Sequence, residues 1–409
     1  MIVQASMHAR ESLPVRAPAS ADGQALLARE PLVVVGSERV PPLIPSAVRP
    51  DRKSCFGPRG AVLFERSGPL WVCDTGHHRL LGWQRLPTVD CAPADWVIGQ
   101  PGFDAEGRNA RGSVTSRSLN VPTGICRVGK NGLAVADAWN HRVLLWKVAP
   151  EASGVAPDVV LGQADFASAE ANRGRDAPRA DTLFWPYGVA WCDGWLCVAD
   201  SENRRVLAWR GVPESNGQPA DLVLGQESFE RRDENSGAAP DRGSMRWPHG
   251  ICSWQSRSGA SQLCISDAGN NRILVYRSMP QQHGAPADIV LGQANGAVVD
   301  HNQSSYWPRA STLNMPYGLS AAGSWLLCAD TANSRLLGYH VDDLATGANA
   351  RALFGQSGFE RKGDNRWQPA AADSLCWPYA VSTCADATAT RVVVADSGNN
   401  RVSVWELAV

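Results

Sequence analysis

The sequence contains no run of about eighteen consecutive apolar residues, which is the length a helix needs to cross a bilayer. We therefore expect no membrane-spanning helix and no membrane partner. The first twenty residues lack the apolar core of a secretory signal peptide, so export by that route is not expected. An excess of charge of one sign is also missing, because 39 basic and 40 acidic side chains give a formal net charge of −1. Such a chain attracts phosphate backbones weakly, so a nucleic acid partner is not expected.

The eleven cysteines include no C-x-x-C pair. Most of them lie in apolar stretches such as WVCD, WLCVAD and WLLCAD. A zinc site or a disulfide framework needs clustered spacing, which this sequence lacks. We therefore expect reduced and buried thiols, no metal and no cofactor, in a cytoplasmic protein.

One phrase recurs six times: an aspartate, four turn-forming residues, an arginine and, four residues later, an aromatic residue. Successive copies are 63 to 67 residues apart. The aspartates are Asp74, Asp137, Asp200, Asp267, Asp330 and Asp396. The arginines are Arg79, Arg142, Arg205, Arg272, Arg335 and Arg401. The aromatic residues are Trp83, Trp146, Trp209, Tyr276, Tyr339 and Trp405.

The phrase predicts a β-hairpin, because apolar runs flank four residues rich in Asn, Gly and Ser. A turn of this length places the aspartate opposite the arginine, so the two can bridge the strands. Five of the six turns have Asn in their third position, a residue that tolerates a left-handed backbone and can form hydrogen bonds with its own neighbours. The first turn has His77 there. Since all six Asp–Arg pairs repeat, we interpret them as structural rather than catalytic.

Each of the first five phrases is followed by a Gly-Gln pair that ends a short apolar strand, and then by a proline that opens the next unit. Each unit therefore contains four strands and a connection of about twenty residues, as in a propeller blade. The predicted blades span residues 56–100, 119–163, 183–226, 245–293, 313–356 and 375–409. The fold class is all-β, a six-bladed β-propeller of four-stranded blades.

The sixth unit has only thirteen residues after Asp396 and lacks its fourth strand. The stretch PLVVVGS at residues 31–37 resembles the strand PDVVLGQ of another unit, so we expect it to complete the last blade. We predict a flexible N-terminal segment at 1–28 and one propeller domain at 29–409. Deleting 1–28 should then leave the fold stable, whereas deleting 1–40 should destabilise it.

The phrase LCVADSENRRVLAW, preceded by WPYGVA, resembles the NHL repeat, which builds six-bladed β-propellers. The resemblance covers roughly residues 56–409. It implies the fold more strongly than the function. NHL propellers include the domains with which tripartite-motif ligases bind RNA or protein, and a peptidyl-hydroxyglycine lyase with a histidine-bound metal. Similar six-bladed rings occur in strictosidine synthase and in gluconolactonase-type hydrolases.

The residues beside each proline are the candidate site, because the innermost strands begin there and surround one mouth of the channel. After the proline the candidates are Arg59, Tyr187, His249, Tyr317 and Tyr379. Before it they are Trp185, Trp247 and Trp377. Aromatic residues carry much of the binding energy of interfaces, but they also fill cores. Packing between the blade bases is therefore the competing interpretation.

His249 is the only histidine in this ring, whereas a catalytic zinc site uses about three protein ligands. We expect no metal site and assign no catalytic residue. His77, His78 and His141 lie in hairpin turns, away from the expected channel positions. The leading hypothesis is a non-catalytic scaffold that binds a protein partner. The alternative is a lyase or hydrolase that acts on a small-molecule ligand at the mouth.

Overall fold

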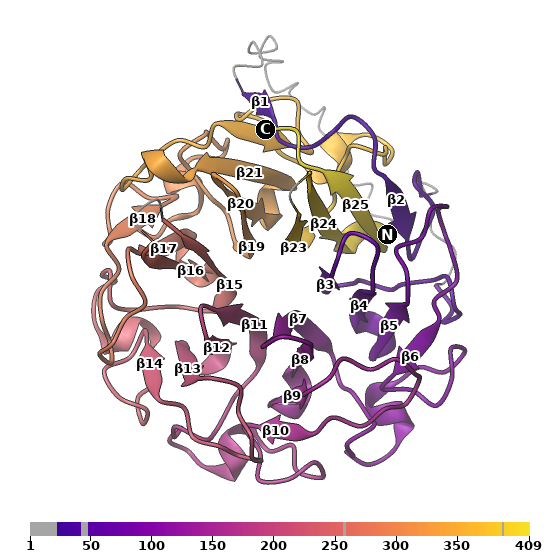
Figure 1. Cartoon of the computed structure of the whole chain (residues 1–409). Helices are drawn as coiled ribbons and strands as arrows, with labels where there is room; N and C mark the ends of the chain where they lie inside the picture. The colour runs from indigo at the N-terminus through magenta and orange to yellow at the C-terminus, as the bar shows by residue number, and fades with distance from the viewer. Residues whose placement is uncertain (1–22, 42–47, 257–258, 387) are drawn as a thin grey trace, which may run out of the picture.

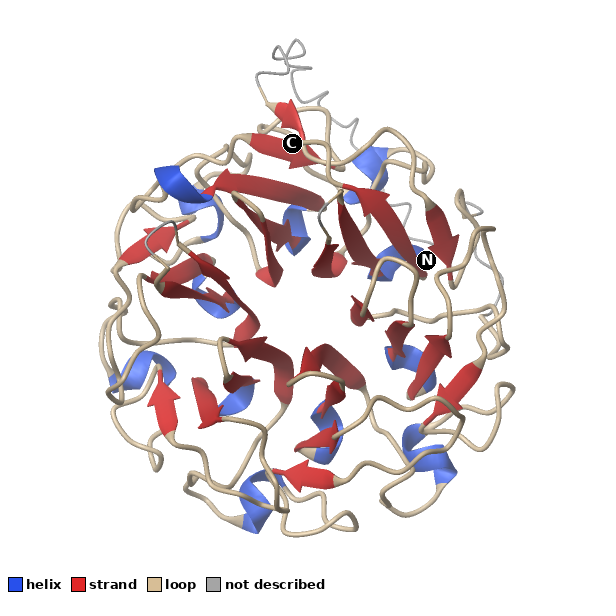
Figure 2. Cartoon of the chain, in the orientation of Figure 1, coloured by secondary structure: helices blue, strands red, loops and turns tan. Residues whose placement is uncertain are grey.

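In the computed structural model, residues 23–41, 48–256, 259–386 and 388–409 are described. They form six sheets arranged as blades around a central axis (Figure 1). In each blade the strands lie side by side in order from the centre to the rim, and loops form most of the periphery (Figure 2). The predicted all-β class, the blade number and the four-stranded blades are confirmed.

The first three blades follow one another in the sequence, each with its innermost strand first. Blade one contains β3 (Gly60–Leu63), β4 (Leu70–Asp74), β5 (Arg79–Trp83) and β6 (Trp96–Ile98). Blade two contains β7 (Pro122–Val128), β8 (Gly132–Asp137), β9 (Arg142–Trp146) and β10 (Val159–Leu161). Blade three contains β11 (Pro186–Cys192), β12 (Trp195–Asp200), β13 (Arg205–Arg210) and β14 (Leu222–Leu224).

The other three blades repeat this order. Blade four contains β15 (Pro248–Gln255), β16 (Ser261–Asp267), β17 (Arg272–Tyr276) and β18 (Ile289–Leu291). Blade five contains β19 (Pro316–Ala322), β20 (Trp325–Asp330), β21 (Arg335–His340) and β22 (Ala352–Phe354). Blade six contains β23 (Pro378–Ala385), β24 (Thr390–Asp396) and β25 (Arg401–Glu406), and its fourth strand is β2 (Val33–Val35).

The predicted closure of the ring by the N-terminal strand is confirmed. Val33, Val34 and Val35 pair in antiparallel register with the last strand of the chain, and all three are buried. Figure 1 shows β2 in indigo beside β25 in yellow. Backbone hydrogen bonds thereby hold the segment that precedes blade one in the last blade, which closes the ring.

The predicted boundary at residue 28 is wrong, because β1 (Gln24–Ala25) pairs in parallel with β22 on blade five. The next residues, Leu26 and Leu27, are buried in the cluster between blades five and six. The sequence did not predict this segment, since a two-residue strand has too few positions to show an alternation pattern. Residues 1–22 of the predicted flexible segment lie outside the described residues.

Short 3-10 turns are the only helices among the described residues, and none has the length or apolar content to cross a membrane. Those in the hairpins are η1 (Thr75–His77), η3 (Ala138–Asn140), η5 (Ser201–Asn203), η7 (Ala268–Asn270), η9 (Thr331–Asn333) and η12 (Ser397–Asn399). Those in the long connections are η2 (Arg108–Arg111), η4 (Ala171–Gly174), η6 (Glu234–Gly237), η8 (His301–Ser304) and η11 (Asp364–Trp367). One more, η10 (Val341–Asp343), follows β21.

The apolar core is divided among the contacts between neighbouring blades. One cluster joins blades three and four, and equivalent clusters lie at the other contacts around the ring. The cluster between blades one and six includes Val33 and Val35 from the N-terminal strand together with Trp83 and Val404. The closing contact is therefore built from buried apolar side chains like the others.

Each repeated Asp–Arg pair is buried and bridges its hairpin, as predicted. In blade two, Arg142 Nε donates to Asp137 Oδ2 at 2.8 Å, and the two residues are opposite each other in the sheet. Arg142 Nη2 also donates to the carbonyl oxygens of Thr115 and Ser118 at 2.9 Å, and Nη1 donates to that of Phe166 at 2.6 Å. The arginine therefore connects its own hairpin to the connections before and after it. We call this unit the latch.

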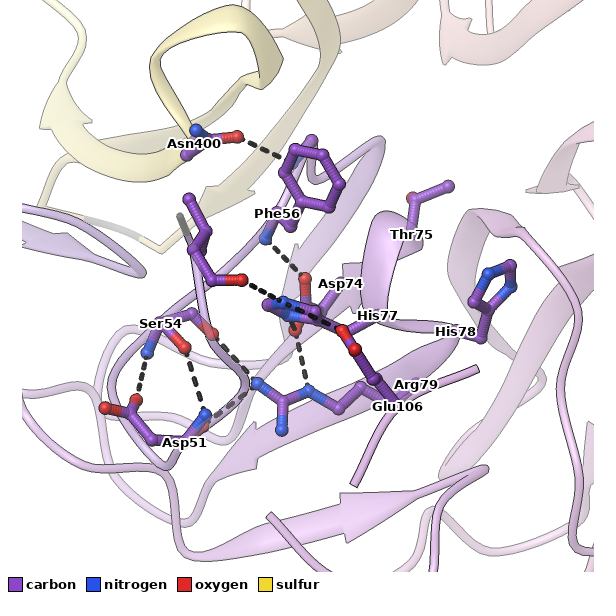
Figure 3. A network of polar contacts seen from close by, with 12 residues as sticks. Asp51, Ser54, Phe56, Asp74, Thr75, His77, His78, Arg79, Glu106 and Asn400 are labelled. Carbon is purple, nitrogen blue, oxygen red and sulfur yellow. Dashed lines mark hydrogen bonds and ion pairs between the residues drawn. The ribbon is translucent and has the colours of Figure 1, made fainter. Parts of the chain in front are cut away.

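The first latch contains a histidine where the others contain asparagine (Figure 3). His77 Nδ1 lies 2.8 Å from Asp74 Oδ2, and its Nε2 lies 3.1 Å from the carbonyl oxygen of Val48. Both neighbours accept hydrogen bonds, so the arrangement favours a protonated ring. Burial lowers the pKa of His77, but the Asp74 carboxylate outweighs that effect and the pKa is raised.

The left-handed residue of each hairpin is the fourth turn residue rather than the third, where five of the copies have Asn. His78, His141 and Asn271 have φ angles of 56°, 52° and 54°. The third residue instead forms hydrogen bonds with the latch aspartate and with the connection that precedes its blade. Asn140, for example, donates to Asp137 Oδ2 at 2.7 Å and forms two hydrogen bonds with Asn109 in the preceding connection.

Candidate functional site

The starts of the innermost strands and the hairpin turns meet at the same end of the propeller. The register explains this, because the proline that begins an inner strand lies opposite the latch aspartate that ends the next one. In blade two, Pro122 pairs with Asp137, and the turn follows directly. One end of the ring therefore collects the residues flanking each proline together with the turn residues.

These residues surround a cavity of about 670 Å³, which we call the mouth. The structure places all eight predicted site residues in its lining: Arg59, Tyr187, His249, Tyr317, Tyr379, Trp185, Trp247 and Trp377. Trp247 and Trp377 are 43% and 41% exposed. That these residues bind a ligand stays a prediction, but they are not dispersed among separate packing contacts.

The sequence reasoning missed the contribution of the hairpin turns and of the residue before Gly57. The mouth is also lined by Phe56, Thr75, His78, Trp139, Ser201 and Ser397. His78 was placed away from the channel in error, since antiparallel pairing brings the turn to the strand start. The signal was available in the repeat, because the turn directly follows the aspartate that pairs with the proline.

Five residues that follow the prolines form a continuous arc across the floor of the mouth. The His249 ring stacks between those of Tyr187 and Tyr317, with centroid distances of 4.9 and 4.2 Å. The Tyr379 ring lies 4.5 Å from that of Tyr317, and the Arg59 guanidinium lies over Tyr379 at 4.8 Å. Aromatic stacking and the cation–π contact hold these side chains in fixed positions.

Glycines allow the inner strands to approach closely enough for this stacking. A Cβ atom on Gly188 would overlap the carbonyl oxygen of His249 on the next inner strand. Any larger residue would force β11 and β15 apart and would separate Tyr187 from His249. The glycine of the sequence pattern Pro-x-Gly is therefore needed for the stacking of the arc as well as for the packing of the blades.

The arc separates the mouth from a second cavity of about 490 Å³ in the central channel, because its residues line both. Small and apolar residues of the inner strands line the second cavity, among them Val62, Ala190 and Leu319. The mouth and the second cavity thus share the residues of the arc as part of their walls.

His249 is a neutral imidazole in this arrangement. Its Nδ1–H donates to the carbonyl oxygen of Trp247 at 3.0 Å. Burial lowers the pKa of His249 to about 4, and the nearby Arg59 charge lowers it in the same direction. Burial also raises the pKa of Tyr317 to about 12, so its hydroxyl group is neutral at physiological pH.

The residue before each proline has a left-handed backbone, which large side chains rarely adopt. The φ angles of Trp185, Trp247 and Trp377 are 49°, 57° and 50°. Such conformations cost about 1–3 kcal/mol each and persist where the surroundings enforce them. The backbone thus accepts strain in order to place three tryptophans at the rim.

Hydrogen bonds from the neighbouring blade hold these strained residues. The N–H groups of Val121 and Trp185 donate to Nδ1 of His78 and His141, at 3.0 and 3.2 Å. An accepting Nδ1 must be unprotonated. Accordingly, burial lowers the pKa of His141 to about 4, and it lowers the pKa of His78 as well.

Other potentially reactive groups do not form a second site of this kind. Within the described ranges, no three His, Cys, Asp or Glu side chains are grouped so that they could hold a metal ion. All eleven cysteines are free thiols. Burial raises the pKa of Cys126 and of Cys264, which makes both poor nucleophiles.

Comparisons with known proteins show a likeness in fold. No protein-family model matches the chain, and the curated protein sequences gave no match. Hydrazine synthase of Kuenenia stuttgartiensis is 10% identical, with a TM-score of 0.49, over 90% of this chain and 98% of that chain. A streptogramin B lyase is 11% identical, with a TM-score of 0.43, over 88% and 94% of the two chains.

A third similar structure is a catalytically inactive virginiamycin B lyase from Staphylococcus aureus with quinupristin. It is 9% identical, with a TM-score of 0.43, over 94% of this chain and 98% of that chain. At such identities the likeness concerns the fold alone and gives no argument about activity. The six-bladed β-propeller of this chain is identified by its own six sheets.

Proposed function

We propose that this chain is a non-catalytic binding propeller of the NHL-repeat type, which presents its aromatic mouth to a protein partner. The observation that carries the proposal is the mouth itself. Four tryptophans, three tyrosines and a phenylalanine line one cavity of about 670 Å³. Aromatic side chains that remain accessible in a concave site are the usual anchors of binding energy.

The backbone of the rim supports the same proposal. All six residues before the prolines have a left-handed backbone, Val121 and Met315 included, and Gly57 adopts it in blade one without a side chain. Trp247 and Trp377 keep this backbone and remain two-fifths exposed. Strain of this kind concentrates at functional sites.

The cysteines support a cytoplasmic location as part of the proposal. All eleven are free, and seven of them are buried in the blades. Free thiols persist in reducing compartments.

Capture of partners by an immobilised protein tests the proposal. We expect the double variant Trp247→Ala/Trp377→Ala to lose most partners that the natural protein retains, with an unchanged melting temperature. The matched control is Trp367→Ala, since Trp367 is 66% exposed but does not line the mouth. Equal loss in the control and the double variant would contradict a binding site at the mouth.

A lyase or hydrolase acting on a small molecule is the second candidate. The neutral His249 favours it, because Nδ1 is the donor in the hydrogen bond to Trp247 and Nε2 can therefore act as a base. Mass spectrometry of a compound bound at the mouth separates the two candidates. Recovery of the unchanged compound supports binding, whereas conversion that His249→Gln abolishes supports catalysis.

A further inference from the structure

The mouth carries a single formal charge, and that charge is positive. Among the described residues that line it, Arg59 is the only arginine or lysine, and none is an aspartate or a glutamate. The two histidines of the lining, His78 and His249, have lowered pKa values and add no charge at neutral pH. The described lining therefore contributes one positive charge inside an aromatic wall, and the Glu202 carboxylate accepts a hydrogen bond from Nε1 of Trp247 at the rim at 3.2 Å.

Arg59 has no carboxylate partner in the part of the chain that the structure describes. Nearby arginines differ in this respect, since Arg204 lies 3.2 Å from Glu202 and Arg246 lies 3.3 Å from Glu234. A partly buried arginine without a counter-ion is available to an incoming anion. Because the site is apolar, an ionic hydrogen bond formed there is less screened by salt than one on the surface.

The surroundings of Arg59 fix the direction in which it can bind. Its guanidinium plane rests on the face of Tyr379 at 4.8 Å, and its backbone N–H donates to Cys73 at 3.2 Å. Stacking on one face leaves the N–H edge of the guanidinium for a planar acceptor. Burial raises the pKa of Tyr317 to about 12 and also that of Tyr379, so both hydroxyl groups beside Arg59 are neutral and add no negative charge that would oppose an anion.

The charge of the site favours a carboxylate over a phosphate. A phosphate group carries nearly two negative charges, and phosphate-recognising sites use clusters of arginines. The mouth has one arginine, Arg59, in its described lining. The floor position of Arg59 and the tryptophans at the rim place an apolar group above the anion.

We propose that Arg59 is the recognition residue for a carboxylate, and that the apolar group next to this carboxylate lies between the tryptophans of the rim. The inference rests on the proposed function, since it names the chemistry by which the mouth selects its partner. The carboxylate is either the C-terminus of the partner or an acidic side chain.

Three short peptides test the inference by titration calorimetry. They are acetyl-leucyl-phenylalanine with a free carboxylate, its C-terminal amide, and acetyl-glutamyl-phenylalanine amide, whose only carboxylate is on the side chain. We expect the free acid to bind at least tenfold more tightly than its amide, which is the usual effect of one ionic hydrogen-bonded contact. The third peptide identifies the source, because affinity equal to that of the free acid indicates recognition of an acidic side chain.

Variants connect the preference to the residue. Arg59→Gln should reduce the tenfold preference to about one, and Arg59→Lys should restore only part of it because it lacks the planar fork. Arg210→Gln is the matched control, since Arg210 stacks on Trp195 at 4.7 Å and does not line the mouth. It should keep the full preference.

The failures are distinguishable. Equal affinity for acid and amide, with both weakened by Trp247→Ala/Trp377→Ala, would overturn the role of Arg59 and leave the binding mouth standing. Binding of the peptides that the tryptophan variant does not weaken, or no binding at all, would overturn both. Circular dichroism of each variant ensures that a loss of affinity is not a loss of fold.

Discussion

The latch and the mouth residues lie a few residues apart in every blade, yet the latch residues are the same in all six copies whereas the mouth residues differ. The latch keeps Asp and Arg in all six copies, with an Nε to Oδ2 distance of 2.7 or 2.8 Å each time. The residue after the proline changes around the ring: Arg59, Thr123, Tyr187, His249, Tyr317 and Tyr379. Repetition marks the residues that build each blade. Differences between copies mark the asymmetric surface on which one particular ligand can be recognised.

The largest expected loss of stability comes from removing β1 and β2, the N-terminal strands that join the last two blades of the ring. Deleting residues 1–40 removes β2 and its three buried valines, and we expect the ring to lose most of its stability. Deleting 1–28 removes Leu26 and Leu27, which should cost about 3–6 kcal/mol, since each buried leucine contributes about 1.5–3 kcal/mol. Deletion of 1–22 is the control. The melting temperature should be highest for the 1–22 deletion, lower for the 1–28 deletion and lowest for the 1–40 deletion. Equal melting temperatures for the 1–22 and 1–40 deletions would refute the closure of the ring by β2.

The next largest effect comes from breaking one latch. Asp267→Ala leaves Arg272 buried without its carboxylate, and such a change costs about 3–5 kcal/mol. Chemical denaturation should show this loss, with no selective effect on binding at the mouth once the protein is folded. A stability equal to that of the natural protein would show that the latch does not hold the blade.

A smaller effect is expected from a histidine that titrates between two blades. Because burial lowers the pKa of His141 to about 4 in the folded protein, the unfolded chain binds a proton there first. Its contribution to stability is complete above about pH 6.5 and is lost as the pH falls toward 4. Chemical denaturation between about pH 6.5 and pH 4 should show the free energy of unfolding decreasing as the pH falls.

His141→Asn is the matched variant for this test. Asn271 occupies the equivalent turn position in blade four, and its Oδ1 accepts from the N–H of Met315 at 2.9 Å. The variant should keep the contact between the blades and make the slope shallower by up to one proton. An unchanged slope of the free energy of unfolding against pH would show that groups other than His141 cause the pH dependence.

The smallest effect on stability is expected in the mouth. Trp247→Gly removes a side chain that is 43% exposed and also relieves a left-handed backbone, which costs a non-glycine residue about 1–2 kcal/mol. We expect the free energy of unfolding to stay within about 1 kcal/mol of the natural value while ligand affinity falls. A large loss of stability would indicate that this tryptophan packs the blades instead.

Much of the fold could be predicted because the phrase repeats. Six copies of Asp74 and its equivalents fixed the hairpins, and the strand-like residues 31–37 fixed the closure. The short β1 could not be predicted, because its contribution depends on Leu26 and Leu27 reaching the contact between blades five and six, which lie at the far end of the sequence. The site was predicted only in part. The strand starts were recognisable, but His78 and Trp139 come to the mouth through the antiparallel register rather than through any pattern of their own.

The division between latch and mouth is tested most directly by two arginine variants measured together. For Arg59→Gln and Arg272→Gln, the melting temperature and the affinity for acetyl-leucyl-phenylalanine are determined on the same preparations. We predict that Arg59→Gln keeps its melting temperature and loses about tenfold in affinity, whereas Arg272→Gln loses stability and, while folded, keeps its affinity. Unfolding of the Arg59 variant, or full affinity in it, would contradict the account.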